Sequence, residues 1–303
     1  MKDFNKTINK KRKLSFLRST AMKRLKTSET NQSHEEKQSN PYLKEVLKLK
    51  KTIKNWDCLF SADAERRMED WIRIDVLGQP LLEKYAWAIP TPEALNVMRK
   101  FSPIVEIGAG KGYWSYLLQR YGCSVLPYDI NPPKESWTKV RKGTPQTLLN
   151  LKGKGCKGLT LFLCYPDEAD SVALPCLEHI VSSQDAESNN ESAFSDYILH
   201  VGELIHTGCA SGSPQSPWGR SSSPDFQVKL SEFYHCVASV PLVSFPFSRD
   251  YLTVWKRTKI LSMVDEVVEG EEEAEKDEWK DIPKSEALMS SALWAPGYAD
   301  LFL

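Results

Sequence analysis

The stretch "IVEIGAGKGYWSYLLQRYGCSVLPYDI", residues 104–130, decides the fold. It begins with a short apolar strand, continues through three glycines spaced two apart, and then takes on the periodicity of a helix. A second apolar strand follows and ends in an acid, Asp129. A strand, glycine loop, helix and strand in this order are typical of folds that bind a nucleotide-like cofactor at the carboxyl edge of a parallel sheet.

The glycine loop distinguishes between kinds of nucleotide site. A phosphate-binding P-loop is excluded because it needs a serine or threonine after its lysine, whereas Gly112 follows Lys111 here. A dinucleotide loop has the form G-x-G-x-x-G, but Gly108, Gly110 and Gly112 give G-x-G-x-G. Tyr113 stands where the third glycine of that motif would pack the helix on the strand. The dinucleotide interpretation is therefore weakened but stays open.

A third kind of site binds S-adenosylmethionine, which carries no phosphate, so the loop must let the backbone approach an adenosine and a cationic amino-acid end. Glu106, two residues before Gly108, is useful in such a site. The stretch "VEIGAGKGYWS" resembles the first motif of class I S-adenosylmethionine-dependent methyltransferases, acid-x-G-x-G-x-G. The resemblance extends to Asp129, 23 residues after Glu106, and to the last two predicted strands. It covers roughly residues 92–257, about half of the chain.

The resemblance implies which residues hold the cofactor. In that family the glycine loop wraps the methionine part, and an acid at the end of the second strand accepts hydrogen bonds from both ribose hydroxyls. A carboxylate suits this role because it accepts two hydroxyl hydrogens at once. The expected cofactor-binding residues are Glu106, Gly108, Gly110, Gly112, Asp129, Ile130 and Cys164.

The rest of the chain alternates apolar strands with helices, which predicts an α/β fold with a Rossmann-like, mostly parallel seven-stranded sheet and helices on both faces. The runs "LTLFLC" (159–164) and "YILHV" (197–201) read as buried strands. The runs "CVASVPLVSF" and "DYLTVWKR" are expected to form a closing antiparallel hairpin. Helices are expected at 42–53, at 61–76 with an end at Gly78, from the N-cap Thr91 onward, at 135–151 with a short strand, at 170–181 and at 225–233.

Ligands of open parallel sheets bind beyond the carboxyl ends of the strands, so "CYPDE", residues 164–168, is expected beside the cofactor. This segment partly matches the Asn/Asp-Pro-Pro-aromatic motif of amino-methylating members of the family. Tyr165, Asp167 and Glu203 are therefore the candidate catalytic residues. Each has a structural alternative: Tyr165 could cap the sheet, Asp167 the following helix, and Glu203 could pair with a Lys or Arg.

Charge divides the chain although its formal net charge is zero. Residues 1–26 contain ten Lys or Arg and one acid, whereas residues 265–281 contain ten acids and two lysines. Blocks of this kind stay solvated and often serve as interaction tails. The expected organisation is a disordered basic arm (1–40), an N-terminal helical extension (41–90), a class I methyltransferase-like domain (91–260), and an acidic tail with a short apolar C-terminus (261–303).

Seven cysteines with no C-x-x-C pair argue against a disulfide framework and a zinc site, and they favour a reducing compartment. No stretch approaches the roughly 20 apolar residues that span a bilayer. The N-terminus lacks the apolar segment of a signal peptide. We therefore expect a nuclear or cytoplasmic protein without a membrane span or a metal site.

The expected function is methyl transfer from S-adenosylmethionine to an acceptor that the sequence does not identify. A nitrogen on RNA is favoured over a protein side chain because of the basic arm and the partial proline motif. Positioning supplies most of the rate when the nucleophile is good, so few catalytic groups are needed. The alternatives are a non-catalytic, methyltransferase-like binding module and a nucleotide-dependent oxidoreductase.

Overall fold

The computed structural model describes residues 39–54, 56–57, 64–153, 156–169, 171–185, 193–204 and 219–258. Contacts divide the chain into two units, Met1–Asn40 and Pro41–Leu303, and every helix and strand named below belongs to the second. The predicted acidic tail and nearly all of the predicted basic arm lie outside the described residues.

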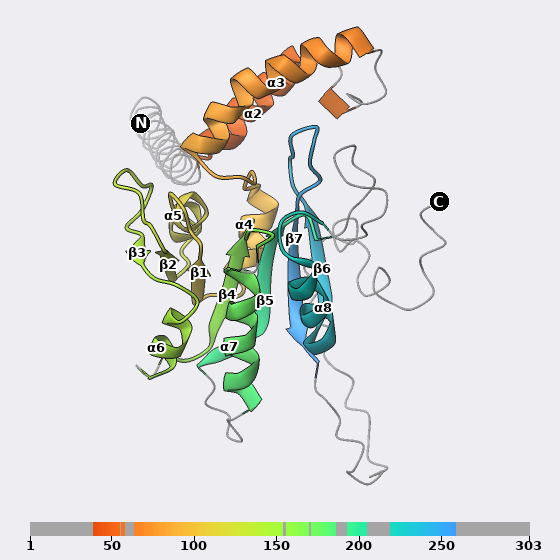
Figure 1. Ribbon diagram of the computed structural model, residues 1–303. Helices are drawn as coiled ribbons and strands as arrows, with labels where there is room; N and C mark the ends of the chain where they lie inside the picture. Colours follow the sequence, from red (N-terminus) through yellow and green to blue (C-terminus); the bar gives the residue numbers. More distant parts are fainter. Residues whose placement is uncertain are drawn as a thin grey trace, which may run out of the picture. The chain divides into compact units, whose positions relative to one another are not determined.

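A seven-stranded sheet forms the centre of the second unit, in the order β3-β2-β1-β4-β5-β7-β6 (Figure 1). The first five strands pair in parallel, whereas β7 runs antiparallel between β5 and β6. The predicted fold class is therefore confirmed, including the closing antiparallel hairpin. The strands are β1 Ile104–Ile107, β2 Val125–Asp129, β3 Arg141–Lys142, β4 Leu159–Cys164, β5 Phe194–Gly202, β6 Tyr234–Pro241 and β7 Tyr251–Arg257.

Helices cover both faces of the sheet. Neighbouring residues of a strand point to opposite faces, so each strand contributes side chains to the core on either side. Phe162 of β4 belongs to the core shared with α2, α3, α4 and α5, whereas Leu161 and Leu163 belong to the core shared with α6, α7 and α8. The helices are α2 Pro41–Thr52, α3 Ala64–Lys84, α4 Pro92–Arg99, α5 Tyr113–Arg120, α6 Thr147–Gly153, α7 Ala173–Asp185 and α8 Pro224–Phe233.

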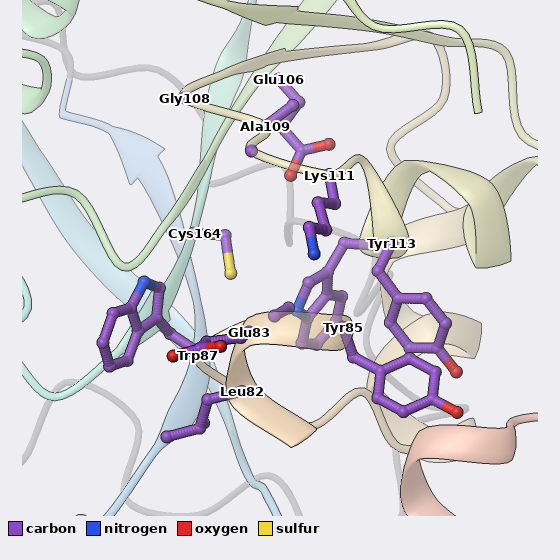
Figure 2. Close-up of a pocket in the computed structure, with 13 residues that line it drawn as sticks. Leu82, Glu83, Tyr85, Trp87, Glu106, Gly108, Ala109, Lys111, Tyr113 and Cys164 are labelled. Carbon is purple, nitrogen blue, oxygen red and sulfur yellow. The ribbon is translucent and has the colours of Figure 1, made fainter. Parts of the chain in front are cut away.

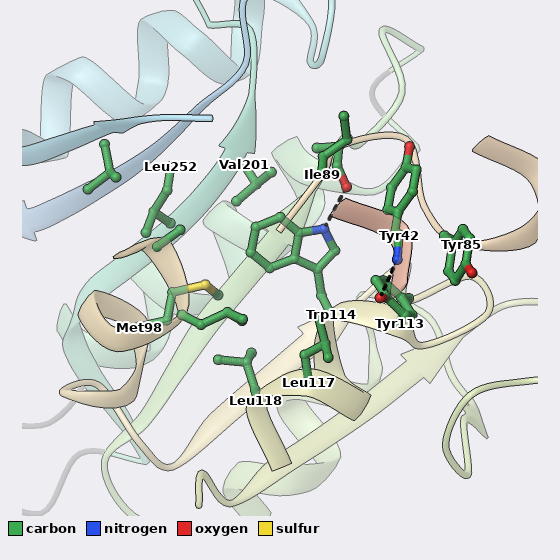
Figure 3. Packing of buried hydrophobic residues seen from close by; sticks show 14 of the residues in the cluster. Tyr42, Tyr85, Ile89, Met98, Tyr113, Trp114, Leu117, Leu118, Val201 and Leu252 are labelled. Carbon is green, nitrogen blue, oxygen red and sulfur yellow. Dashed lines mark hydrogen bonds between the residues drawn. The ribbon is translucent and has the colours of Figure 1, made fainter. Parts of the chain in front are cut away.

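Trp114 of α5 anchors the first of these cores (Figure 3). Its side chain is fully buried and packs edge-on against Phe162, with 5.8 Å between the ring centroids. Its indole N–H donates to the carbonyl oxygen of Ala88, at 3.2 Å. The backbone N–H of Tyr42 in α2 donates to the Tyr113 hydroxyl, also at 3.2 Å. Side chains of α5, directly after the glycine loop, thus fasten the N-terminal helices to the sheet.

Two local predictions hold at single-residue resolution. The side chain of Thr91 accepts a hydrogen bond from the backbone N–H of Ala94, and Pro92 is the first residue of α4, as the capping signals predict. The run "LTLFLC" is β4, with the predicted bounds. Both signals are local, which is why they can be read without knowing the tertiary structure.

The second helix is longer than predicted. We expected Gly78 to end it, but α3 continues through Gly78 and Pro80 to Lys84. A Cβ at Gly78 would lie 2.8 Å from Cε1 of Phe245, so the glycine permits a close approach to the segment between β6 and β7. Pro80 removes one backbone donor inside the helix without ending it.

The helix predicted for 135–151 is wrong over most of its length. Helix α6 begins only at Thr147, whereas the predicted short strand is present as the two-residue β3, which pairs with β2 before it. Trp137 explains the difference. Its backbone N–H donates to the Lys111 carbonyl oxygen at 2.8 Å, and its indole N–H donates to the Lys84 carbonyl oxygen at 2.9 Å. These tertiary hydrogen bonds hold the segment against the glycine loop.

The described part of the chain contains no helix that is both long and apolar enough to cross a membrane. Within the same residues, no three His, Cys, Asp or Glu side chains are grouped so that they could hold a metal ion. The cysteines that the structure describes there as free thiols are Cys123, Cys156, Cys164, Cys176 and Cys236.

Candidate cofactor and acceptor site

The glycine loop follows β1 at the carboxyl edge of the sheet. Gly108, Gly110 and Gly112 have φ angles of 81°, 52° and 71°, which glycine adopts without steric cost. A Cβ at Gly112, the N-cap of α5, would lie 2.7 Å from Cγ2 of Val140. Nothing lies within 4 Å of the corresponding position at Gly110. Gly112 is therefore required for packing, whereas Gly110 leaves open space at the loop.

Asp129, at the end of β2, lies beside this loop. Its Oδ2 accepts a hydrogen bond from the backbone N–H of Gly110 at 2.8 Å, and its Oδ1 accepts one from Asn131 at 2.9 Å. A carboxylate offers about four lone-pair sites, so about two remain for further donors. The adjacent Ile130 side chain is 59% exposed. An acid and an apolar surface thus stand next to each other at the tip of β2.

Glu106 lies at the base of the same loop. Its side chain is buried, and its carboxyl group accepts a hydrogen bond from the Ser115 hydroxyl. Burial raises the pKa of Glu106 to about 8, and the charge of Asp129 adds to this effect, while the Ser115 hydrogen bond opposes it. The Glu106 carboxyl group is therefore mostly neutral at pH 7.

A pocket of about 220 Å³ opens at the glycine loop (Figure 2). One wall is the loop itself, from Gly108 to Lys111, with Glu106 at its base. The side chains of Lys111 and Cys164 extend from the loop and from the end of β4 toward the residues 82–87. The remaining lining residues are Leu82, Glu83, Tyr85, Ala86, Trp87, Tyr113 and Trp114.

The pocket contains some of the predicted cofactor residues and not others. Those that line it are Glu106, Gly108, Gly110 and Cys164. Those that lie outside its lining are Gly112, Asp129 and Ile130. Asp129 remains connected to the pocket because it accepts a hydrogen bond from Gly110.

The segment from Leu82 to Trp87 was missed by sequence reasoning. Tyr85 holds it in place, because its ring stacks on Tyr42 at 4.7 Å and on Trp137 at 5.1 Å. The Tyr85 hydroxyl also donates to Glu45 at 2.8 Å. No motif marks this segment, and the run "YAWA", with aromatic and small residues alternating, is the one local signal in it.

Tyr165 follows directly after β4 and is the neighbour of Cys164, which lines the pocket. Its φ is 51°, a region that costs a non-glycine residue roughly 1–3 kcal/mol. Its backbone N–H donates to the Val201 carbonyl oxygen at 2.8 Å, and its hydroxyl donates to Asp250 at 3.0 Å. Its ring stacks against Trp87 with 6.4 Å between centroids. The strained tyrosine is therefore connected to the pocket wall.

Sequence reasoning also missed Asp250, although the hydroxyl groups of Tyr165 and Ser248 both donate hydrogen bonds to its carboxylate. It lies just before β7, and because β7 is antiparallel, its first residues meet the carboxyl ends of β4 and β5. Burial raises the pKa of Asp250 to about 6, and hydrogen bonds from Tyr165, Ser248 and Ser244 oppose this rise. The sequence shows only an acid before the last strand, which is a weak signal.

Glu203 follows β5 and is buried, and its Oε1 has no hydrogen-bond partner among the described residues. Burial raises the pKa of Glu203 to about 7. The negative charge of Asp250 adds to the rise, while the cationic side chains of Arg220 and Arg249 oppose it. Glu203 is therefore poised to gain or lose a proton near neutral pH.

Asp167, the third candidate catalytic residue, has different surroundings. Its side chain is exposed, and it accepts a hydrogen bond from the hydroxyl of Ser171, four residues later, at 2.6 Å. Ser171 precedes α7, which begins at Ala173, so this contact is not a cap of that helix. The structure thus brings Tyr165 together with Asp250 and Glu203, and it gives Asp167 a contact within its own turn.

No protein-family model matches the chain, and no curated protein matches it. Several solved structures overlap with it loosely. Human N-acetylserotonin methyltransferase in complex with S-adenosylmethionine is 13% identical, with a TM-score of 0.35 over 72% of this chain and 67% of that one. A 1,6-didemethyltoxoflavin-N1-methyltransferase from Burkholderia thailandensis is 14% identical, with a TM-score of 0.35 over 63% and 87%. An S-adenosylmethionine-dependent methyltransferase from Aquifex aeolicus is 13% identical, with a TM-score of 0.32 over 58% and 92%.

At these identities, structural similarity indicates the fold alone. Because the structures overlap so loosely, no function is transferred from these proteins to this chain. The chain resembles class I S-adenosylmethionine-dependent methyltransferases at the level of the superfamily. This resemblance is carried by the acid-x-G-x-G-x-G loop, by the acid that ends β2, and by the seven-stranded sheet with its antiparallel last strand.

Proposed function

We propose that the chain is an S-adenosylmethionine-dependent methyltransferase and that its acceptor is a nitrogen, on RNA in preference to a protein side chain. One observation carries the cofactor assignment. The Asp129 carboxylate is held by the Gly110 N–H at a loop with open space, and it keeps lone pairs that suit two ribose hydroxyls.

The residues present fit the cofactor in parts. The pocket of about 220 Å³ is smaller than the roughly 300–1,000 Å³ of pockets that enclose whole drug-sized ligands. It therefore suits the amino-acid end, whose carboxylate Lys111 would hold and whose ammonium group Glu83 would hold. The ribose would be held by Asp129 and the adenine would lie on Ile130, which are both outside the pocket lining.

S-adenosylmethionine, when bound, supplies an electrophilic methyl group. The chain itself orients the acceptor and handles one proton. Trp87, which is largely exposed, offers an aromatic face to a planar acceptor, and its ring also contacts the ring of Tyr165. Asp250 positions Tyr165 by accepting a hydrogen bond from the tyrosine hydroxyl. Glu203 takes the proton that an acceptor nitrogen loses, since its pKa is raised to about 7 and one of its oxygens lacks a partner. Proximity supplies the larger part of the rate.

Transfer of labelled methyl groups tests this proposal. The full chain is incubated with methyl-labelled S-adenosylmethionine and with RNA and protein fractions of a cell extract, beside the Asp129→Ala variant. We expect label in the RNA fraction with the unchanged chain and a loss of at least tenfold with the variant. Label in the protein fraction alone would contradict the RNA acceptor. Label in neither fraction, with the cofactor still bound, would contradict catalysis.

One observation favours a second candidate, a non-catalytic binding module. Leu82, Tyr85 and Trp87 come from the chain itself and narrow the pocket, as a protein that had lost catalysis would tolerate. Such a module would bind its partner at the same affinity whether or not Asp129 is replaced. Partner binding that weakens in Asp129→Ala only when S-adenosylhomocysteine is present would argue for the enzyme.

A further inference from the structure

We propose that RNA phosphates bind a basic surface beside the pocket, formed by one face of α2 and by the segment 134–142. The surface is called the basic rim here, and its cations are Lys44, Lys48, Lys51, Lys134 and Lys139. The role of this RNA as the methyl acceptor rests on the proposed function, whereas the binding itself does not.

The first half of the basic rim is the outer face of α2. This helix contains four lysines against one glutamate. Lys44, Lys48 and Lys51 are spaced four and three residues apart, so they share one face, and all three are exposed. The opposite face carries the buried residues Tyr42, Val46 and Leu49. Lysines on a helix that is fixed to the core by its other face present charge at a defined position.

The second half is the segment 134–142, which contains four cationic side chains and one acid, Glu135. Lys134 and Lys139 are exposed on either side of Trp137. Arg141 is turned toward the Tyr128 ring, at 5.9 Å from its centroid, so it is left out of the rim. In the part of the chain that the structure describes, Lys51, Lys134 and Lys139 form no ion pair.

A continuous set of contacts joins the two halves. Burial raises the pKa of Glu45 in α2, but hydrogen bonds from Tyr85 and Lys84 and the charges of Lys84 and Lys48 bring it below its ordinary value. The Lys84 ammonium group lies 3.1 Å from the Glu45 carboxylate. Tyr85 in turn stacks on Trp137, at the middle of the second half. The Glu45 carboxylate, which joins α2 to Lys84 and Tyr85, is therefore paired with cations.

The rim also reaches the cofactor loop. The backbone N–H of Trp137 donates to the Lys111 carbonyl oxygen at 2.8 Å, so Lys134 and Lys139 flank a residue that is bonded to the loop. Tyr85 lines the pocket and at the same time stacks on Trp137. Trp87, 60% exposed, also lines the pocket. A strand that follows the rim would reach the pocket with an aromatic ring available for a base.

Single-stranded RNA matches these features better than an acidic protein does. Lysine ammonium groups are compact point charges that suit the repeating phosphates of a backbone, and exposed aromatic rings stack on bases without regard to sequence. An acidic protein segment would use the lysines but would leave Trp87 without a role. The rim thus favours a nucleic-acid strand over an acidic peptide.

Charge reversal tests the proposal on the full chain. Two double variants, Lys48→Glu with Lys51→Glu and Lys134→Glu with Lys139→Glu, are compared with Arg99→Glu with Lys100→Glu. The control pair is exposed and lies at the end of α4, before the amino end of β1 and thus at the opposite edge of the sheet. The probe is a fluorescent 20-nucleotide single-stranded RNA of mixed sequence, titrated at several KCl concentrations. Calorimetry with S-adenosylhomocysteine is run on all four proteins.

We expect each rim variant to bind the RNA at least tenfold more weakly at about 100 mM KCl. The slope of log affinity against log salt should fall by about 1.4, which corresponds to two phosphate contacts on a single strand. The control should stay within twofold of the unchanged chain. Rim variants that keep the original affinity and slope would overturn the inference, as would binding of a poly-glutamate peptide in place of RNA. If the unchanged chain does not bind S-adenosylhomocysteine, that result would overturn the cofactor assignment and not the rim.

Discussion

The two halves of the site are built in different ways. The cofactor half consists of the glycine loop and Asp129, and its hydrogen bonds run between backbone N–H groups and one half-exposed carboxylate. The acceptor half consists of Tyr165, Glu203 and Asp250, which come from the ends of three strands. It contains a tyrosine at φ 51° and a buried carboxyl oxygen without a partner among the described residues.

The two halves therefore differ in the free-energy cost of their backbone and side-chain arrangements. A glycine loop adopts positive φ at little cost, so the backbone of the cofactor half is not strained. A positive φ at tyrosine and a buried, unpartnered carboxylate oxygen each cost free energy that the fold does not recover. Costs of this kind collect at sites where a ligand or a reaction uses them. The acceptor half therefore marks the chemistry more directly than the glycine motif does.

The largest expected effect concerns two of the three glycines in the cofactor half. Gly112→Ala places a Cβ 2.7 Å from Val140 at a φ of 71°, so we expect the free energy of unfolding to fall by roughly 3 kcal/mol. Gly110→Ala meets no atom within 4 Å and should cost about 1 kcal/mol, from the backbone alone. Urea denaturation measures both. Equal losses would show that the loop is not packed against Val140 as described.

A second effect separates Glu106 from the acceptor half by pH. The folded-state pKa of Glu106 is raised to about 8, so its contribution to stability is complete below about pH 4.5 and is lost as the pH rises through 8. Glu106→Gln lacks this titration. The stability of the variant relative to the unchanged chain should therefore increase by about 2 kcal/mol between pH 6 and pH 8. Chemical denaturation across this range measures it, and parallel curves would contradict a buried, protonated Glu106.

A third effect tests the acceptor half by rate. Glu203→Gln cannot take a proton, so methyl transfer should slow about tenfold while the Kd for S-adenosylhomocysteine stays within twofold. The rate of the unchanged chain should rise with pH near 7, and the variant should lose this rise. Glu178→Gln serves as the control, because Glu178 is an exposed residue of α7 that forms an ion pair with Lys229 of α8. An unchanged pH profile in Glu203→Gln would remove Glu203 from the chemistry.

The smallest effect concerns Tyr165. Tyr165→Phe removes one hydroxyl donor from the buried Asp250 and should lower the free energy of unfolding by about 1 kcal/mol. Tyr116→Phe is the matched control, because the Tyr116 hydroxyl accepts only an exposed hydrogen bond from Arg120 and should cost less than about 0.5 kcal/mol. Thermal unfolding compares the pair. Equal stability of the two variants would mean that Asp250 does not depend on Tyr165.

The same division explains what the sequence could predict. The loop, β4 and the cap at Thr91 follow from local signals, and each was predicted at the residue level. The residues that shape the pocket from outside the loop, such as Tyr85 and Asp250, were not predicted. They reach the site through stacking, through hydrogen bonds between residues 40 and 85 positions apart, and through the reversed direction of β7.

Tertiary contacts also explain the two errors in the helices. Trp137 donates hydrogen bonds to the backbone carbonyl oxygens of Lys111 and Lys84, and these contacts override the helical pattern of its segment. Gly78 serves the approach of Phe245 and does not end α3. In both cases the deciding partner is distant in the chain, so no window of local sequence contains it. The boundaries of the arm, the extension, the domain and the tail stay predictions.

Calorimetry with S-adenosylhomocysteine, with NAD as the competing ligand and Asp129→Ala as the variant, is the sharpest test of the proposed cofactor site. We expect a Kd on the order of micromolar for the unchanged chain, binding at least tenfold weaker in the variant, and no heat with NAD. Absence of S-adenosylhomocysteine binding, or equal binding by Asp129→Ala, would contradict the proposed site.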